Sequence, residues 1–431
     1  MIGRRIMSGF DSLISVDKAL NIILEYASKI KVNSIKIDIE DSIGRVLAED
    51  IYANIDLPPF DRSTVDGYAV IAEDTFGSSP INPTILKIID EIECGVDPNN
   101  AKPLNTGECS VIFTGAPLPP NANAVVMAEN AKRKNGFVEI YKQVQPFSNV
   151  SRKGEDFKKG EIVVKRGTKI KAWHIGAIAS FNIKEILVYR KIKVALISTG
   201  SELKEVGSII KPGEIVNTTK PLLKALLKEK NCEIIDLGSV PDDIEKIKEK
   251  IMIGINSSDI LIITGGTSLG KKDIVPEAIN EIAKPGLIFH GVAIRPGKTM
   301  GFGVNENKLI FMISGLPVAA MISFIAFIEP AIDKILNCFP EPKPIIKAKL
   351  SRRVVNPVGF KSFMRVFIKK INNNYIAEPL RLTGSGILST LTKANGILII
   401  PENIEGYEEN EEVEVLLTQS LGDDKNGQNF S

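Results

Sequence analysis

An apolar run that ends in a glycine-rich turn constrains this chain more than any other feature. Residues 259–264 read Asp-Ile-Leu-Ile-Ile-Thr, and the turn Gly-Gly-Thr-Ser-Leu-Gly follows directly. A short apolar run before such a turn is typical of a buried strand in a parallel sheet. The turn offers backbone N–H groups beside the positive end of a helix expected to begin near Asp273. The sequence therefore predicts a phosphate cradle that includes Thr264, Gly265, Gly266 and Ser268.

A second apolar run ends in the same way. Residues 194–202 read Val-Ala-Leu-Ile-Ser-Thr-Gly-Ser-Glu, which adds Thr199 and Gly200 to the expected ligand contacts. Because parallel strands end at the same edge of a sheet, the two turns should lie close together. A nucleotide-like or phosphorylated ligand across the carboxyl edge is the expected occupant.

The hydrophobic period changes along the chain and divides it into several domains. Residues 12–30 have helical spacing, whereas 60–150 contain short strands punctuated by Gly, Pro and Asn. From residue 193 strands alternate with helices, which predicts a doubly wound α/β domain. Short strands return after the prolines at 340–344. The predicted division is a mixed, discontinuous N-terminal domain (1–55 and 151–190), a β-rich domain (56–150), an α/β domain (191–340), a small C-terminal β-barrel (341–418) and a disordered tail (419–431).

Composition excludes several classes of function. Lys plus Arg number 54 against 52 for Asp plus Glu, and a net charge of +2 gives no reason to expect nucleic-acid or membrane binding. The four cysteines are widely spaced, which favours reduced thiols over a zinc site or a disulfide framework. With only two histidines, a metal site must depend on oxygen ligands, and this favours magnesium.

Two further stretches bear on location and packing. Residues 311–328 carry no charge, but Gly315 and Pro317 break them into a strand, a turn and a buried helix rather than a membrane span. The N-terminus lacks the apolar core of a signal peptide, so we expect a cytoplasmic protein. Trp173, in an expected helix, is interpreted as a packing residue.

Acids and cations gather where the expected strands end. Glu202, Asp242, Asp243 and Asp273 follow strand ends or begin helices, so they could bind magnesium together with ligand phosphates. The alternative is that each acid caps a helix. Arg295 and Lys298 flank a tight turn and could contact phosphate or an oxyanion, although solvated turn charges are equally consistent with the pattern.

Three loops of the first half of the chain have unusual composition. Residues 59–69, 112–117 and 152–156 combine acids, hydroxyls, aromatics and glycine. Such a mixture suits a functional loop better than a spacer, although no single loop is specific.

Taken together, these segments resemble the molybdopterin molybdenumtransferase family, which includes MoeA and the E-domain of gephyrin. The resemblance extends in order from about residue 12 to 417. It is carried by PPFDRSTVDGYAV (58–70), FTGAPLP (113–119), VVMAEN (125–130), RKGEDFKKG (152–160), STGSEL (198–203), TGGTSLGKKD (264–273), IRPGKT (294–299) and RLTGSGILSTLTKANGILIIP (381–401).

The resemblance implies a cytoplasmic homodimer of four-domain subunits that inserts molybdate or tungstate into the dithiolene of adenylylated molybdopterin. AMP is released and Mg²⁺ takes part, and the adenylyltransferase of the same pathway is an implied partner. The β-rich domain of the second subunit would close the cleft of the α/β domain. Carried over by position, Asp66 and Thr114 would come from that β-rich domain and Asp156 from the hinge. Glu202, Asp242 and Asp273 would bind ligand and metal, and Arg295, Lys298 and Ser385 would contact anionic groups.

The chain departs from the family pattern at several positions. Ser201 replaces a usual Asp, and Leu316 replaces the Asn of the usual Leu-Pro-Gly-Asn-Pro turn. Arg295 stands where many members have Lys, Gly291 where some have another Lys, and Ser151 where some have Arg. These changes concern anion contacts rather than the fold.

Two other functions remain open at this stage. A pterin-binding scaffold with a degenerate site would fit the changes at Ser201 and at the 313–317 turn, although Asp66, Glu202 and Asp273 are kept. A different enzyme built on the same α/β module, an adenylyltransferase or a nucleotide pyrophosphatase, would lack the domain at 56–150.

Overall fold

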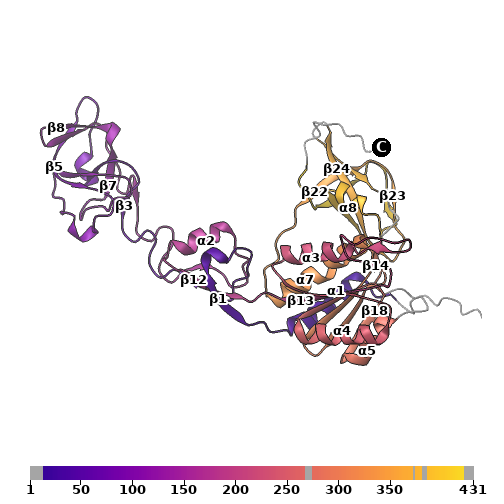
Figure 1. The fold of residues 1–431 in the computed structure, drawn as a ribbon. Coiled ribbons are helices and arrows are strands. Elements are labelled where there is room, and N and C mark those ends of the chain that lie inside the picture. Colours follow the sequence, from indigo (N-terminus) through magenta and orange to yellow (C-terminus); the bar gives the residue numbers. More distant parts are fainter. Residues whose placement is uncertain (1–12, 267–273, 372–373, 381–385, 422–431) are drawn as a thin grey trace, which may run out of the picture.

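The computed structural model describes residues 13–266, 274–371, 374–380 and 386–421. The molecule is elongated, with a β-rich body at one end, a small mixed body in the middle, and an α/β body beside a barrel at the other end (Figure 1). The expected fold class, α/β and β domains in one chain, is confirmed. The exact domain boundaries stay predictions.

The β-rich body is built on one sheet of order β7-β4-β6-β5-β9-β8. Its hairpin at Asn135-Gly136 has both residues at positive φ, the conformation that such tight two-residue turns require. The strands are β4 (Gly67–Val70), β5 (Thr84–Ile92), β6 (Glu108–Ile112), β7 (Ala124–Met127), β8 (Ala131–Lys134) and β9 (Phe137–Ile140), with β3 (Arg62–Ser63) and β10 (Val150–Ser151) paired beside them.

The middle body combines two short ribbons with one helix. Strand β1 (Ser34–Asp38) pairs with β12 (Glu185–Tyr189), and β2 (Ile51–Tyr52) pairs with β11 (Ile162–Val164). Helix α2 (Ala172–Ala179) covers them and fully buries Ile178. Trp173, predicted to be a packing residue, is 66% exposed, and its ring contacts His174 and Lys171 at the start of the same helix.

The first helix packs against the α/β body, although the middle body follows it in the sequence. Helix α1 (Val16–Ser28) begins at Ser15, whose hydroxyl accepts from the Lys18 N–H. Its buried face, which includes Ala19 and Ile23, joins the largest apolar cluster together with α7 (Glu329–Ile335) of the α/β body.

The α/β body is a doubly wound sheet of order β16-β13-β17-β21-β20-β18. Helices α4 (Ile244–Ser257) and α5 (Ile274–Ile282) cover one face, and α3 (Thr219–Glu229), α6 (Pro317–Ser323) and α1 cover the other. A π-helix (Phe324–Ile328) joins α6 to α7. The strands are β13 (Lys193–Thr199), β16 (Glu233–Val240), β17 (Ile260–Thr264), β18 (Pro285–His290), β20 (Gly301–Asn305) and β21 (Lys308–Ile313).

Sequence reasoning missed one strand of this sheet. Strand β20 pairs antiparallel with both neighbours, so the sheet is parallel only from β16 to β21. Its glycines hid it. At Gly301 a Cβ would lie 2.6 Å from Met312 Cε, so the end of the Met312 side chain would have to move to admit one. The stretch 311–328 forms strand, turn and helix as expected, and no helix in the described part of the chain is long and apolar enough to cross a membrane.

The C-terminal body is a closed barrel, as expected. Its sheet runs β24-β25-β22-β28-β26, and β26 pairs back with β24. These strands are β22 (Ile345–Leu350), β24 (Lys361–Ile371), β25 (Asn374–Pro379), β26 (Gly396–Ile400) and β28 (Glu412–Leu417), accompanied by β23 (Val354–Val355), β27 (Gly406–Tyr407) and α8 (Ser389–Lys393). Of the expected disordered tail, Gln419 donates to Asn395 O and Leu421 packs against the barrel, while 422–431 lie outside the described residues.

Candidate active site

Three parallel strands bring polar groups to one edge of the α/β sheet. Ser198 of β13 lies opposite Thr264 of β17, and Thr264 lies opposite Ile313 of β21. The three strands therefore end side by side. Thr264 Oγ1 donates to Ser198 Oγ at 3.1 Å, and Thr199 Oγ1 lies 3.4 Å from Thr264 O. These buried hydroxyls tie the strand ends together beneath the turns that follow.

The turn after β17 admits only glycine. Gly265 and Gly266 have φ of +88° and +61°. A Cβ at Gly265 would lie 2.4 Å from Thr199 O, and one at Gly266 would lie 2.6 Å from Val275 Cγ2. Side-chain-free backbone at a sheet edge next to a following helix is the arrangement that binds phosphate groups. The structure thus brings together Thr199, Gly200, Thr264, Gly265 and Gly266, as predicted.

A pocket of about 800 Å³ opens from this edge toward the barrel. Its α/β side is formed by Gly265 and Gly266, the 294–299 loop and the 314–316 turn. Its barrel side is formed by β24 and by apolar residues that include Val355 and Phe360. Strand β19 (Ile294–Arg295) joins the two sides, because it pairs in parallel with β24 of the barrel.

Three cationic side chains line this pocket. Arg295 and Lys298 come from the 294–299 loop, as predicted, and Arg365 comes from β24. Arg365 is only 4% exposed, and this burial lowers the pKa of its guanidinium below the ordinary value. It donates to Phe363 O and to Thr390 Oγ1. A buried cation at a pocket wall favours an anionic ligand.

Sequence reasoning missed Arg365, although a signal was present. Residues 362–368 read Ser-Phe-Met-Arg-Val-Phe-Ile, so the arginine interrupts an otherwise apolar strand. A charged residue in such a run is buried only with partners or a function. That signal was local and could have been read without the fold.

Two of the three predicted metal ligands lie on adjacent segments at the same edge of the sheet. The carboxylate oxygens of Glu202 lie 2.8 and 2.9 Å from the point that a Cβ at Gly200 would occupy. Asp242 lies on the neighbouring segment, and its N–H donates to Ser201 Oγ at 3.3 Å. Asp243, by contrast, caps α4 through the N–H groups of Glu245 and Lys246. For Asp243, the capping alternative is therefore correct.

The fit to a divalent cation rests on those two carboxylates. Within the described residues no group of three or more His, Cys, Asp or Glu side chains could hold a metal ion. Asp273, the third predicted ligand, lies outside the described residues, as do Ser268 and Ser385. Oxygen-only donors over a glycine turn nevertheless suit Mg²⁺, which is commonly held by one or two carboxylates and ligand phosphates.

The remaining predicted residues lie outside the α/β body and the barrel: Asp66 and Thr114 in the β-rich body at the opposite end of the molecule (Figure 1), and Asp156 in the connection to the middle body. Asp66 precedes β4 and Thr114 follows β6, which are neighbours in the β-rich sheet. Thr114 donates to Asp66 Oδ1 from its backbone N–H at 2.7 Å and from its hydroxyl at 2.8 Å. These two hydrogen bonds lower the pKa of the Asp66 carboxyl. Asp156 lies between β10 and β11, in the connection to the middle body, where its N–H donates to Leu57 O.

The whole chain is similar to known proteins. Three family models match it: "MoeA N-terminal region (domain I and II)" over residues 14–182, "Probable molybdopterin binding domain" over 195–334, and "MoeA C-terminal region (domain IV)" over 347–418. A molybdopterin biosynthesis protein of Methanocaldococcus jannaschii is 43% identical over 392 residues, which are 89% of this chain and 92% of that protein.

The chain belongs to the MoeA family. The molybdopterin molybdenumtransferase of Bacillus subtilis is 33% identical over 409 residues, and the match covers 94% of each chain. The crystal structure of a MoeA protein from Pyrococcus horikoshii matches with a TM-score of 0.81 at 35% identity, covering 94% of this chain and 100% of that one. The family resemblance drawn from the motifs is therefore confirmed.

Most departures from the MoeA pattern have a structural explanation. Gly291 has φ of +94°, a conformation that disfavours the lysine found in some members. The Ser151 hydroxyl donates to Glu155 and is nearly buried. Leu316 is 47% exposed and lines the pocket, and its Cδ2 lies 3.3 Å from the point that a Cβ at Gly386 would occupy. Leu316 thus gives the rim an apolar contact with the barrel where the family usually has an amide.

Proposed function

We propose that this chain inserts molybdate or tungstate into the dithiolene of adenylylated molybdopterin with release of AMP, the last step of molybdenum cofactor biosynthesis. One observation carries the proposal. The pocket of this MoeA chain combines the glycine turn at Gly265 and Gly266 with three cationic side chains and an apolar wall. That combination suits a ligand with phosphates, an oxyanion and a flat ring system.

Each part of the pocket has a role in this scheme. The N–H groups of the turn at Gly265 and Gly266 would hold phosphate oxygens. Arg295, Lys298 and Arg365 would neutralise the oxyanion and the pterin phosphate, with Ser385 as a further contact. The apolar barrel side would cover the pterin. Held by both sides, the ligand is fixed in orientation while water is excluded.

Glu202, Asp242 and Asp273 would hold Mg²⁺ at the sheet edge. A bound Mg²⁺ supplies charge neutralisation to the phosphoanhydride that joins molybdopterin to AMP. The two described carboxylates lie on segments joined by the hydrogen bond from the Asp242 N–H to the Ser201 hydroxyl. Their part is to fix the cation relative to the glycine turns.

Asp66, Thr114 and Asp156 would complete the site in a homodimer. The β-rich body, which carries the Asp66–Thr114 pair, and the α/β body with the barrel, which form the pocket, lie at opposite ends of one chain (Figure 1). A shared site would therefore need a second copy to bring the pair to the pocket. Residues 203–216, which follow Glu202, expose apolar side chains at Val206 (67%) and Ile209 (90%). We call residues 203–216 the arm, and exposed apolar side chains of this kind are typical of a surface that a partner covers. The adenylyltransferase of the pathway and a cytoplasmic location belong to the same proposal.

The decisive assay follows AMP release from adenylylated molybdopterin. Purified protein would be given Mg²⁺ and either molybdate or tungstate, and we expect AMP release that depends on the oxyanion. The preferred oxyanion identifies the cofactor that is made. Tight pterin binding without AMP release under either oxyanion would contradict the enzyme and favour the pterin-binding scaffold, for which the Leu316 rim is the supporting observation.

A mixing experiment tests the shared site. D66N and K298A each remove one half of the proposed site, on different bodies of the chain. After unfolding and refolding together in equal amounts, the two inactive variants should regain about a quarter of wild-type turnover, since half of the dimers carry one intact site of two. No recovery, with dimers demonstrated by sedimentation, would contradict the second-copy arrangement.

A further inference from the structure

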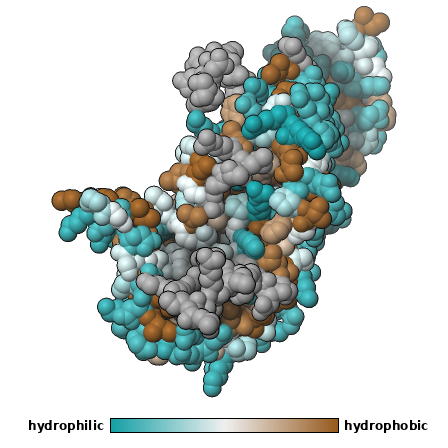
Figure 2. Space-filling model, turned by 90° about the vertical axis from the view of Figure 1, so that its right-hand side faces the viewer, coloured by the Kyte–Doolittle hydropathy of each residue, from teal (hydrophilic) through white to brown (hydrophobic). Residues whose placement is uncertain are grey.

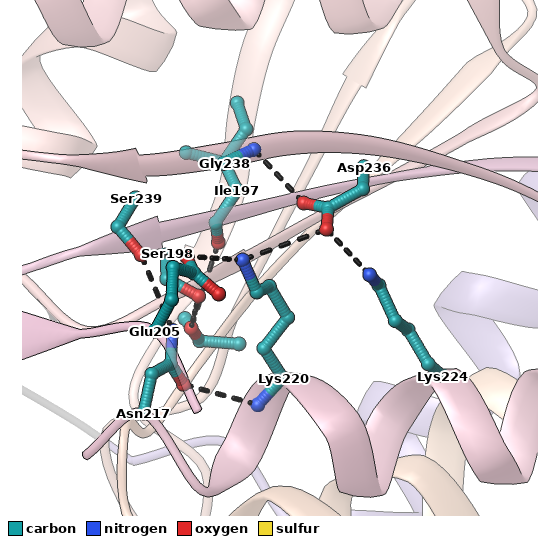
Figure 3. Close-up of polar contacts among 10 residues, drawn as sticks. Ile197, Ser198, Glu205, Asn217, Lys220, Lys224, Asp236, Gly238 and Ser239 are labelled. Carbon is teal, nitrogen blue, oxygen red and sulfur yellow. Dashed lines mark hydrogen bonds and ion pairs between the residues drawn. The ribbon is translucent and has the colours of Figure 1, made fainter. Parts of the chain in front are cut away.

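Lys220 is a lysine that the fold almost completely buries. It lies in the first turn of α3 and is 5% exposed. Its Nζ is 2.5 Å from Glu205 Oε1 and 3.5 Å from Asp236 Oδ2, as Figure 3 shows. A buried ammonium group is retained only where such partners compensate its lost hydration. The ammonium group is thus buried, whereas the side chain of its partner Glu205 is 53% exposed and that of Asp236 is 31% exposed.

The partners of Lys220 come from two other segments. Glu205 lies in the arm that follows the acids of the sheet edge, and Asp236 lies in the edge strand β16. Glu205 Oε1 also accepts from Ser239 Oγ at 3.1 Å, and the Lys220 N–H donates to Asn217 Oδ1 at 3.1 Å (Figure 3). The helix start, the edge strand and the base of the arm are thus held at one point.

The held segment is the one that carries Glu202. At its start, the Gly200 N–H donates to Val240 O at 3.0 Å, and the Glu202 carboxylate folds back over Gly200. At its end, Glu205 is bound to Lys220. Glu202 is consequently fixed from both sides, next to the segment of Asp242.

The same turn of α3 reaches the pocket. Thr219 Oγ1 donates to Gly315 O at 2.5 Å, and Gly315 belongs to the 314–316 turn of the pocket lining. Residues 219 and 220 therefore connect the acidic edge on one side with the pocket turn on the other.

We propose that Lys220 is a positioning residue: through Glu205 it holds residues 201–205 so that Glu202 stays next to the segment that carries Asp242. The inference rests on the proposed function, which gives those two acids their role at the metal. Loss of the Lys220 charge would leave Asp236 with Lys224 and the Gly238 N–H as partners. Among the described side-chain contacts, Glu205 would keep only its hydrogen bond from the Ser239 hydroxyl, so the arm should become less ordered.

Lys224 provides a matched control. It ion-pairs with Asp236 at 2.5 Å and, within the described part of the chain, has no ion pair with Glu205. K220M and K224M thus remove the same charge from the same helix, but only K220M releases the arm. K220R keeps the charge, and E205Q removes it from the other partner.

The experiment compares the four variants on the full chain with three measurements. Hydrogen exchange reports the order of residues 201–216, Mn²⁺ binding followed by electron paramagnetic resonance reports the acids, and steady-state kinetics report AMP release. For K220M and E205Q we expect exchange about tenfold faster, a Kd for Mn²⁺ about tenfold higher and a kcat about tenfold lower, as loss of one charge-assisted contact predicts. KM for adenylylated molybdopterin should change less than about twofold, because its anion contacts lie on other segments. K220R and K224M should stay within about twofold of wild type in all three.

The outcomes separate this proposal from the proposed function. Faster exchange in K220M with unchanged Mn²⁺ affinity and kcat would show a purely structural role and overturn the inference. Equal losses in K224M and K220M would do the same. If wild-type protein binds Mn²⁺ but releases no AMP, the proposed function fails, and the comparison of Mn²⁺ affinities between K220M and K224M decides the positioning role. A wild-type chain that neither releases AMP nor binds Mn²⁺ would overturn both.

Discussion

The glycine turn after β17 allows a prediction whose magnitude follows from two separable causes. In G265A the new Cβ would lie 2.4 Å from Thr199 O, and the backbone would keep a φ of +88°. Left-handed backbone costs an alanine about 1–2 kcal/mol. The contact is with a carbonyl at the end of a central strand, which cannot retreat, so overpacking should add about 1–3 kcal/mol. We therefore expect G265A to lower the free energy of opening of this sheet by roughly 2–5 kcal/mol.

G213A is the matched control for this prediction. Gly213 lies in the arm with a φ of +89°, and a Cβ there would meet nothing within 4 Å. It isolates the backbone cost of about 1–2 kcal/mol. Hydrogen exchange of the amides in β13 and β17 on the full chain measures the free energy of opening for wild type and both variants. If G265A is no more destabilised than G213A, the close approach of the two turns is not the reason for the glycine, and the account of the cradle is wrong.

Three further predictions follow from other parts of the molecule. R190M removes both hydrogen bonds that Arg190 makes to Asp259, which is 5% exposed. Urea unfolding should then show a free energy of unfolding lower by about 3–5 kcal/mol, and R190K should recover part of that loss. A loss below about 1 kcal/mol would contradict a stabilising buried pair. A thiol-selective reagent at pH 8 should modify only Cys94 rapidly, because Cys94 is the exposed cysteine. Burial raises the thiol pKa of the other three cysteines to about 11 or 12. A second rapidly modified thiol would contradict this account. The hydrogen bonds from Thr114 lower the pKa of the Asp66 carboxyl below its ordinary value of 3.8. They therefore stabilise the fold above pH 3.8, and this contribution is lost as the pH falls through the lowered pKa of the folded state. In T114A, carbon-13 NMR of the carboxyl should show a titration midpoint that returns toward 3.8.

Local patterns were enough to predict much of the fold and part of the site. The apolar run before Gly265 and the helix that follows Pro317 depend on neighbours in sequence, and both lie where the pattern placed them. Strand β20 was missed because Gly301 and Gly303 weaken the strand pattern, and the approach of the Met312 side chain to Gly301 exists only after folding. The exposed position of Trp173 is equally a tertiary fact.

The composition of the pocket was beyond local reasoning for a different reason. Arg295 lies in the α/β body and Arg365 in the barrel, and they meet only because β19 joins the barrel sheet. Asp66 was placed in the same site only by the resemblance, and within one chain it lies at the other end of the molecule. Side chains that meet through such pairings, or through a second copy, leave no spacing in the sequence to detect.

Polar and apolar residues are interspersed over the end of the molecule that carries the α/β body and the barrel (Figure 2). The edge with Glu202 and Asp242 therefore differs from the rest of this surface in where its residues lie rather than in its composition. The serine at 201 illustrates this. In place of the usual Asp, its hydroxyl accepts the Asp242 N–H, a bond that a carboxylate could also accept. Serine therefore keeps the link between the segments of Glu202 and Asp242 while it removes one negative charge from the edge. If the edge binds a cation as proposed, fewer charges attract that cation and the placement of Glu202 and Asp242 matters more. The proposed role of Lys220, through its contact with Glu205, is to secure this placement.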